Sequence, residues 1–328
     1  MNQNICIDFG EENTGVYIPD VKIEKNPFPS VILYNLNKPI YFGLKAIEHH
    51  DTSNNNHTLF RNFKTGFSEG KKFHLNNGAE IKAEKIISDF IGMIVGDRKL
   101  PILMSDDRVS IKKCDFGQLG KFIKFVDESD ALLRYFIDMN NIQVDEYVFL
   151  SCGLSHNTVM LVKNEKIIKV IEGNVTSQCI TNAIINIARD KLTSRVFEKL
   201  KADRIVYNKL LMSVEEIKQT FGYGDDNVKI SFEYSLMKRV PELFRCDGEI
   251  NITHNELQSC FTPTMDEIIN LITSIKSKSM LVGFGGFCEA AYVQHVIKCN
   301  LDKKFEKIIF IPSPEGRLAT VLGMKLMK

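Results

Sequence analysis

A possible phosphate-binding turn lies in residues 7–15, IDFGEENTG, where an apolar run reaches Asp8 and turns at Gly10. A strand that ends in a glycine turn can cradle phosphate through its backbone N–H groups. Here Glu11 and Glu12 occupy the turn. Two carboxylates within about 4–6 Å of a triphosphate repel it by several kcal/mol unless a metal ion or a lysine intervenes. Backbone donors still serve if both side chains point to solvent. We interpret the turn as the remnant of a phosphate loop.

The two common nucleotide-binding signatures do not occur. The Walker pattern fails because FSEGKKF and GQLGKFI lack the hydroxyl and the glycine spacing. The dinucleotide fingerprint fails because GFGGFC does not fit it. What remains is a pair of glycine turns after strands, one in each half of the chain. Two such hairpins can clamp a triphosphate from both sides.

Composition places the chain among ordinary globular proteins. Its 328 residues are 44% hydrophobic and 25% charged, and the net charge is +1. We therefore expect no nucleic-acid partner and no attraction to an anionic membrane. No apolar run approaches the roughly 18 residues of a membrane helix. The eight cysteines form no C-x-x-C pair, and no Cys/His spacing suggests zinc. Reduced thiols in the cytoplasm are the simplest inference.

Strands and helices mix in both halves of the chain. Short strands joined by tight turns open the sequence at residues 5–18, and a second meander starts at residue 145. Amphipathic helices follow in each half, and the chain closes with a helix over 314–328. Residues 254–276 read as a helical stretch interrupted at Pro263. This pattern predicts an α/β protein of two related lobes.

Eight segments resemble DnaK-type heat-shock chaperones of the actin-like ATPase superfamily, and they follow the order found there. In sequence they are IDFGEENTGVYI, FPSVI, FGLKA, TLFRNFKTGF, VDESDALLRYF, EEIKQTFG with VKISFE, MLVGFGGFCEAAYVQ and PSPEGRLATVLGMKL. The resemblance runs from residue 5 to residue 326. It implies the two-lobed actin-like ATPase fold with a central cleft, lobe I over 1–144 and lobe II over 145–328. Nothing is left over for a peptide-binding domain.

The resemblance also implies a set of site residues. Catalytic roles fall to a metal-associated acid, a phosphate-facing lysine and a water-positioning glutamate: Asp8, Lys64 and Glu128. Phosphate contacts fall to the two turns: Gly10, Asn13 and Gly153. Adenosine contacts fall to a helix and a glycine segment: Glu215, Lys218, Gly285 and Gly286. The implied ligands are ATP or ADP with Mg²⁺, held at Asp8, and we expect any nucleotide to lie between Gly10 and the adenosine residues.

Each of these residues also has a purely structural explanation. In that explanation Asp8 is a turn or capping residue. Lys64 is a solvated loop lysine, and the adjacent Phe63 leaves the alignment of Lys64 with the family's lysine uncertain by one residue. Glu128 begins a helix, where the dipole favours a carboxylate. Gly10 and the Gly285–Gly286 pair mark tight turns under either explanation.

The sequence departs from the chaperone pattern at its phosphate turns. Glu11 and Glu12 replace threonines, Ser151 stands where the second turn carries an aspartate, and His156 stands in place of a threonine. We interpret His156 as a polar turn residue, since no acid partner is visible near it. At best, therefore, the chain is a weak ATPase.

Three functions remain open. The first is a divergent chaperone-type protein that binds ATP with slow or absent hydrolysis. The second is a pseudo-ATPase that serves as a regulatory or binding scaffold for a protein partner. The third is an actin-like protein that self-associates into filaments. Retained adenosine-side residues favour the first, and the altered phosphate turns favour the second.

Overall fold

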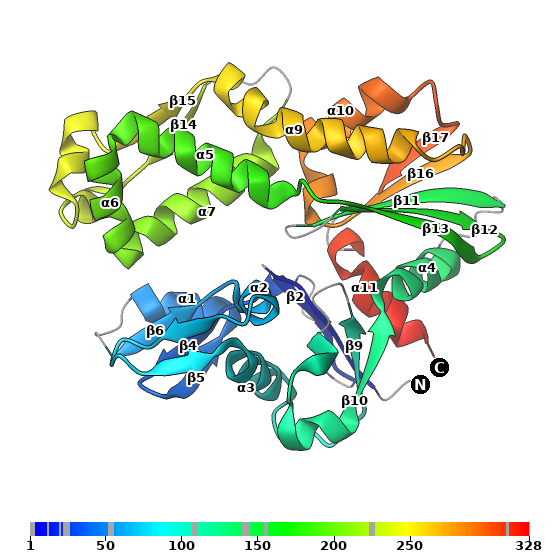
Figure 1. The fold of residues 1–328 in the computed structure, drawn as a ribbon, viewed down its shortest axis with the longest axis horizontal. Coiled ribbons are helices and arrows are strands. Elements are labelled where there is room, and N and C mark those ends of the chain that lie inside the picture. The colour runs from blue at the N-terminus through cyan, green and yellow to red at the C-terminus, as the bar shows by residue number, and fades with distance from the viewer. Residues whose placement is uncertain are drawn as a thin grey trace. The chain divides into compact units, whose positions relative to one another are not determined.

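The computed structural model describes residues 4–11, 13–19, 21, 27–51, 56–106, 111–139, 145–153, 157–222, 227–312 and 315–327. The chain forms two compact units, which are coloured by residue number in Figure 1. Unit 1 consists of residues 1–143 and 312–328, and unit 2 of residues 144–311.

A five-stranded mixed sheet forms the centre of unit 1. Its strand order is β10-β9-β1-β2-β3. The strands are β1 (Ile5–Phe9), β2 (Asn13–Tyr17), β3 (Phe28–Pro29), β9 (Ile102–Asp106) and β10 (Ile123–Asp127). β1, β9 and β10 are parallel, whereas β1, β2 and β3 form an antiparallel meander. The carboxyl ends of the three parallel strands therefore share one edge.

Successive side chains of a strand alternate between the two faces of a sheet. The apolar side chains of β1 therefore need cover on both faces, and helices provide it on each. Ile5, Ile7 and Phe9 pack in one cluster with Phe90 of α3 (Ala83–Val95). Cys6 points the other way and packs with buried residues of α4 (Glu128–Met139) and α11 (Glu315–Leu326). Figure 1 shows α11, in red, beside α4.

The rest of unit 1 is a smaller sheet with short elements around it. The order β5-β4-β6 is antiparallel throughout, and α1 covers one face of it. Its elements are β4 (Ile32–Asn35), β5 (Lys38–Phe42), β6 (His57–Phe60) and α1 (Gly43–Asp51). Around them lie α2 (Phe63–Ser68), β7 (Lys72–His74), β8 (Glu80–Lys82), η1 (Ile111–Lys113) and η2 (Gly117–Phe122).

Unit 2 repeats the strand arrangement of unit 1. Its sheet has the order β13-β12-β11-β16-β17, again an antiparallel meander followed by parallel strands. The strands are β11 (Glu146–Cys152), β12 (Asn157–Lys163), β13 (Lys166–Gly173), β16 (Met280–Phe284) and β17 (Lys307–Phe310). This repetition confirms the two meander starts expected near residues 5 and 145.

Helices and a small hairpin complete unit 2 around one large apolar core. The helices are α5 (Ser177–Leu192), α6 (Ser194–Ala202), α7 (Arg204–Thr220), α8 (Tyr234–Met237), α9 (His254–Thr273), α10 (Ala291–Leu301), η3 (Pro241–Cys246) and η4 (Gly286–Glu289). The hairpin pairs β14 (Val228–Ser231) with β15 (Glu249–Ile252). No helix among the described residues is long and apolar enough to cross a membrane.

Two elements differ from the sequence-based expectation. The closing helix α11, expected in lobe II, belongs to unit 1, where its apolar face packs on α4 and the central sheet. Helix α9 runs unbroken through Pro263. A capping box at Thr253 and Glu256 starts α9, and Phe261 and Met265 are buried on either side of the proline. This packing outweighs the missing proline N–H.

Candidate functional site

Asp8 lies at the carboxyl edge of the unit 1 sheet. In doubly wound sheets this edge is where ligands bind. Asp8 is half-buried on the face of the sheet that α11 covers. Gly15, its neighbour on β2, shows this position: a Cβ added at Gly15 would lie 2.9 Å from Val321 of α11 and 3.7 Å from the Asp8 Cβ. The buried Ser105, at the end of β9, donates a hydrogen bond from Oγ to Asp8 Oδ1 at 2.7 Å. Asp8 is thus a positioned carboxylate, and Ser105 is a partner that the sequence did not reveal.

The first glycine turn is a closed loop held by hydroxyl groups. The Gly10 N–H donates to the Asn13 carbonyl at 3.1 Å. Ser30 Oγ donates to the Gly10 carbonyl at 2.7 Å and lies 2.8 Å from Thr14 Oγ1. Both hydroxyls are buried. Ser30 thus fixes the backbone of the turn at Gly10, and a fixed backbone is what a preorganised phosphate cradle requires.

The Glu11 side chain points into the protein. It is only 7% exposed, and Oε2 accepts a hydrogen bond from the Thr65 backbone N–H at 2.8 Å. Glu11 therefore does not meet the condition that both turn glutamates point to solvent, and Glu12 lies outside the described residues. The turn already holds an anion of its own, bonded to backbone at α2.

Lys64 is a buried lysine close to the same turn. It is 4% exposed, its ammonium donates a hydrogen bond to the Phe9 carbonyl, and Nζ lies 5.3 Å from the Phe9 ring centroid. The alternative of a solvated loop lysine is therefore wrong. Because Lys64 and Thr65 are adjacent, one short segment supplies a cation to the end of β1 and an N–H to Glu11. Asp8, Gly10, Asn13 and Lys64 therefore lie around the same turn at the end of β1.

Glu128 is the first residue of α4, directly after β10. The Asp127 carboxylate caps this helix, accepting from the N–H groups of Ser129 at 2.8 Å and Asp130 at 3.3 Å. Burial, and then the charge of Asp127, raises the pKa of Asp130. The cap was not anticipated, although an aspartate before a helix is its ordinary signal. Glu128 follows this cap directly, at the sheet edge that carries Asp8.

In unit 2 the second turn meets the glycine segment. Gly285, after β16, has φ of 90°, and a Cβ there would lie 2.6 Å from the Cys152 carbonyl oxygen. Only glycine suits this position. Cys152 ends β11 just before Gly153, so Gly153, Gly285 and Gly286 gather at one sheet edge. Burial, followed by Cys288, raises the pKa of the Cys152 thiol.

Glu215 and Lys218 form a buried network on α7 rather than a free pair of polar groups. Lys218 is 3% exposed, and its Nζ lies 2.5 Å from Glu215 Oε2. Thr181 Oγ1 of α5 lies 2.7 Å from Glu215 Oε1 and accepts from Lys218 Nζ at 3.1 Å. Ser177, one turn earlier on α5, donates to the Gly153 carbonyl at 3.0 Å. Helix α5 thus links the second turn to the α7 residues through Thr181, which the sequence did not single out.

The metal expectation rests on Asp8. Among the described residues, no group of three or more His, Cys, Asp or Glu side chains could hold a metal ion. Mg²⁺ is usually bound by one or two carboxylates together with substrate phosphates, so the carboxylate of Asp8 suits it as a single protein ligand. Ser151, half-buried near the end of β11, carries no charge to add. His156 lies outside the described residues.

Comparison with known proteins identifies the fold. The sequence matches no protein-family model. It also matches no curated protein. A solved structure, MreB 5 of Spiroplasma citri bound to AMPPNP, superimposes with a TM-score of 0.63 over 99% of this chain and 96% of that one, at 14% sequence identity. The chain therefore has the actin-like ATPase fold that the sequence resemblance implied. The chaperone assignment made from the sequence stays a prediction.

Proposed function

We propose that this chain is an actin-like nucleotide-binding protein that binds ATP or ADP and hydrolyses ATP slowly or not at all. The observation that carries the proposal is the inward Glu11 beside the buried Lys64, in a turn that keeps its backbone hydrogen bonds. The likeness to a structure bound to AMPPNP supports nucleotide as the ligand class. The resemblance to DnaK-type chaperones extends the proposal to a cytoplasmic chaperone-type protein.

Each retained residue has a role in this proposal. Asp8 supplies a carboxylate for Mg²⁺, Lys64 offsets negative charge at the first turn, and Glu128 orients water. Gly10, Asn13 and Gly153 shape the two turns that face phosphate. Glu215, Lys218, Gly285 and Gly286 contact the adenosine. Hydrolysis is slow because Ser151 offers no second acid, and losing one preorganised electrostatic contact commonly costs a hundredfold or more in rate.

Thermal unfolding with and without nucleotide tests binding. A ligand at 100 times its dissociation constant adds roughly 2.7 kcal/mol of stability, so Mg²⁺ with ADP or ATP should raise the melting temperature. Phosphate release should stay near the detection limit. No shift at millimolar nucleotide would contradict binding. Steady turnover that Asp8→Ala abolishes would contradict slow hydrolysis.

A second candidate is a scaffold that uses the actin-like fold without nucleotide. It is favoured by the internal bonding of the polar side chains, since Glu11 is held by Thr65 and Glu215 by Lys218 and Thr181. A protein partner or a second copy of the chain would then be the ligand. Light scattering with and without ATP tests self-association. Assembly that is independent of ATP favours the scaffold, and assembly that requires ATP favours the nucleotide-binding protein.

A further inference from the structure

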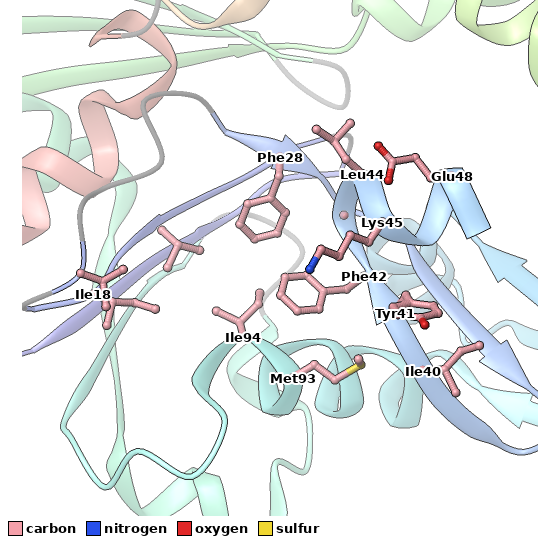
Figure 2. A pocket seen from close by; sticks show the side chains of 13 residues that line it. Ile18, Phe28, Ile40, Tyr41, Phe42, Leu44, Lys45, Glu48, Met93 and Ile94 are labelled. Atoms are coloured by element: carbon pink, nitrogen blue, oxygen red, sulfur yellow. The ribbon is translucent and has the colours of Figure 1, made fainter. Parts of the chain in front are cut away.

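Unit 1 contains an apolar cavity of about 640 Å³ that the proposed nucleotide chemistry does not use. It lies where β2 and β3 meet β5, α1 and α3 (Figure 2). Of its lining residues, all but Gly43, Lys45 and Glu48 carry apolar or aromatic side chains. Pockets for small molecules have volumes of about 300–1,000 Å³ and mainly apolar walls with a few polar groups. This cavity fits that description.

The wall of the cavity is rigid. Phe28 and Phe42 meet edge to face, with ring centroids 5.5 Å apart. Both also pack on the fully buried Phe90, at 6.3 and 6.0 Å between centroids. The ring of Tyr41 is stacked on His49 of α1 at 4.0 Å. Because these rings are fixed by their own packing, the cavity is formed before any ligand enters.

Exposed apolar side chains lie at the entrance. Leu44 is 61% exposed and Val21 is 47% exposed, and both line the cavity. Single exposed apolar residues are common on protein surfaces. Leu44 and Val21 extend the apolar lining from the cavity to the protein surface. An apolar chain that enters the cavity would therefore stay in contact with apolar side chains.

Among the described residues that line the cavity, Lys45 is the only cation. In Figure 2 the Lys45 side chain extends from α1 toward Phe42, whereas the Glu48 carboxylate, one turn later, points toward Leu44. Within the part of the chain that the structure describes, Lys45 makes no ion pair and no hydrogen bond. A lysine stem lying along apolar surface with its ammonium at the edge is well placed to pair with an anionic group of a bound molecule.

We propose that this cavity binds a single unbranched acyl chain that ends in an anion, that is, a fatty carboxylate. The hydrocarbon fills the hollow over Phe28 and Phe42, and the carboxylate pairs with Lys45 at the rim. Each methylene removed from water is worth roughly a factor of four in affinity. Chain length should therefore set the affinity, and Lys45 the preference for an anion.

A tryptophan reporter tests the proposal directly, because the natural chain contains no tryptophan. Leu44→Trp places one fluorophore at the entrance, at an exposed position that does not disturb the core. Dodecanoate below its micelle concentration should shift the emission to the blue with saturation at one molecule per chain. Octanoate should bind at least tenfold more weakly. Dodecylamine, with the same chain and a positive head, should bind about tenfold more weakly than dodecanoate.

Two charge variants in the same background separate the roles of the rim residues. Lys45→Glu should weaken dodecanoate about tenfold and remove the preference over dodecylamine. Glu48→Lys, on the same helix, replaces the one carboxylate among the described lining residues with a second cation, so it should tighten dodecanoate and weaken dodecylamine. Both positions are exposed, so neither variant endangers folding. Val16→Phe, which narrows the cavity, should weaken both ligands together.

Several outcomes would overturn the proposal. These are no saturable response to dodecanoate, equal affinity for dodecylamine, or an unchanged affinity in Lys45→Glu. A response seen only with phosphatidylglycerol vesicles, and never with monomeric dodecanoate, would instead indicate a membrane surface and equally refute a fatty-acid pocket.

Discussion

At the residue scale, the buried side chain of Glu11 decides how the first turn can interact with an anion. A carboxylate that faced solvent would only repel a nucleotide, but this one bonds to the Thr65 N–H in a buried position. It therefore competes with an incoming anion for the same kind of donor. The Glu11 carboxylate thus makes a contact of the kind that a phosphate would make at this turn.

Glu11→Gln should raise the affinity for ADP about tenfold. The glutamine keeps an oxygen for the Thr65 N–H and removes the charge, so the repulsion of phosphate falls while the turn is preserved. Isothermal titration with Mg²⁺ and ADP measures this. The matched control is Glu69→Gln, an exposed glutamate at the other end of α2, which should change nothing. Equal or weaker binding in Glu11→Gln would contradict the competing role.

Buried thiols make stability depend on pH above 9. Burial raises the pKa of Cys6 and of Cys114 to about 12, from an ordinary 9.0, while Lys325 opposes the shift at Cys6 and the neighbouring Glu84 and Asp115 add to it at Cys114. Above pH 9 the unfolded chain loses these protons and the folded chain keeps them. Stability is therefore intact below pH 9 and falls as pH rises toward 12, by up to about 1.4 kcal/mol per pH unit for each thiol.

Urea unfolding at pH 7.5, 9 and 10 checks this slope. Cys114→Ala should be less stable at pH 7.5 but lose less stability with pH than the parent does. Cys299→Ser, at an exposed thiol, should keep the parent slope. Identical slopes in all three proteins would show that Cys114 does not contribute to the alkaline loss of stability.

At the element scale, the close contact between α4 and α11 determines how unit 1 responds to substitution. A Cβ at Gly323 of α11 would lie 1.8 Å from the Ala131 carbonyl oxygen of α4, so the two helices touch backbone to backbone. In α3, a Cβ at Gly92 would meet only Leu119 Cδ1 at 3.6 Å, an ordinary contact. Two helical glycines thus differ entirely in their surroundings.

Alanine at these glycines should have opposite effects. Gly323→Ala should lower the free energy of unfolding by about 1–3 kcal/mol or more, because α4 and α11 must separate. Gly92→Ala should raise it by about 0.5–1 kcal/mol through helix propensity. Urea unfolding of both variants against the parent measures the difference. A Gly323→Ala protein as stable as the parent would contradict direct contact of the two helices.

The division of the chain governs behaviour at the whole-molecule scale. Removing residues 312–328 should damage unit 1 and spare unit 2, since α11 covers Cys6, Leu103 and Ala131. Hydrogen exchange by mass spectrometry should show lost protection in β1, β2 and α4 and unchanged protection in β11 and β16. Loss of protection in unit 2 first would contradict the assignment of α11 to unit 1.

Local patterns explain what could be predicted from the sequence. The two meanders could be predicted because their alternating apolar residues and their turn residues are neighbours in the sequence. The direction of Glu11 was not readable, because it depends on Thr65, 54 residues away. The same holds for Thr181, whose partner Glu215 is 34 residues away. An amphipathic pattern over α11 shows that one face is buried and does not show against which partner.

The position of α11 has a consequence for biosynthesis. Unit 2 is continuous in sequence, but unit 1 is completed only when α11 leaves the ribosome, roughly 180 residues after α4. At about 5–20 residues per second, the face of the nascent β1–β9 sheet that carries Cys6 and Leu103 waits uncovered for roughly 10–40 s. Unit 2 is thus free to finish first, and the part of the chain that is synthesised earliest is the last to close.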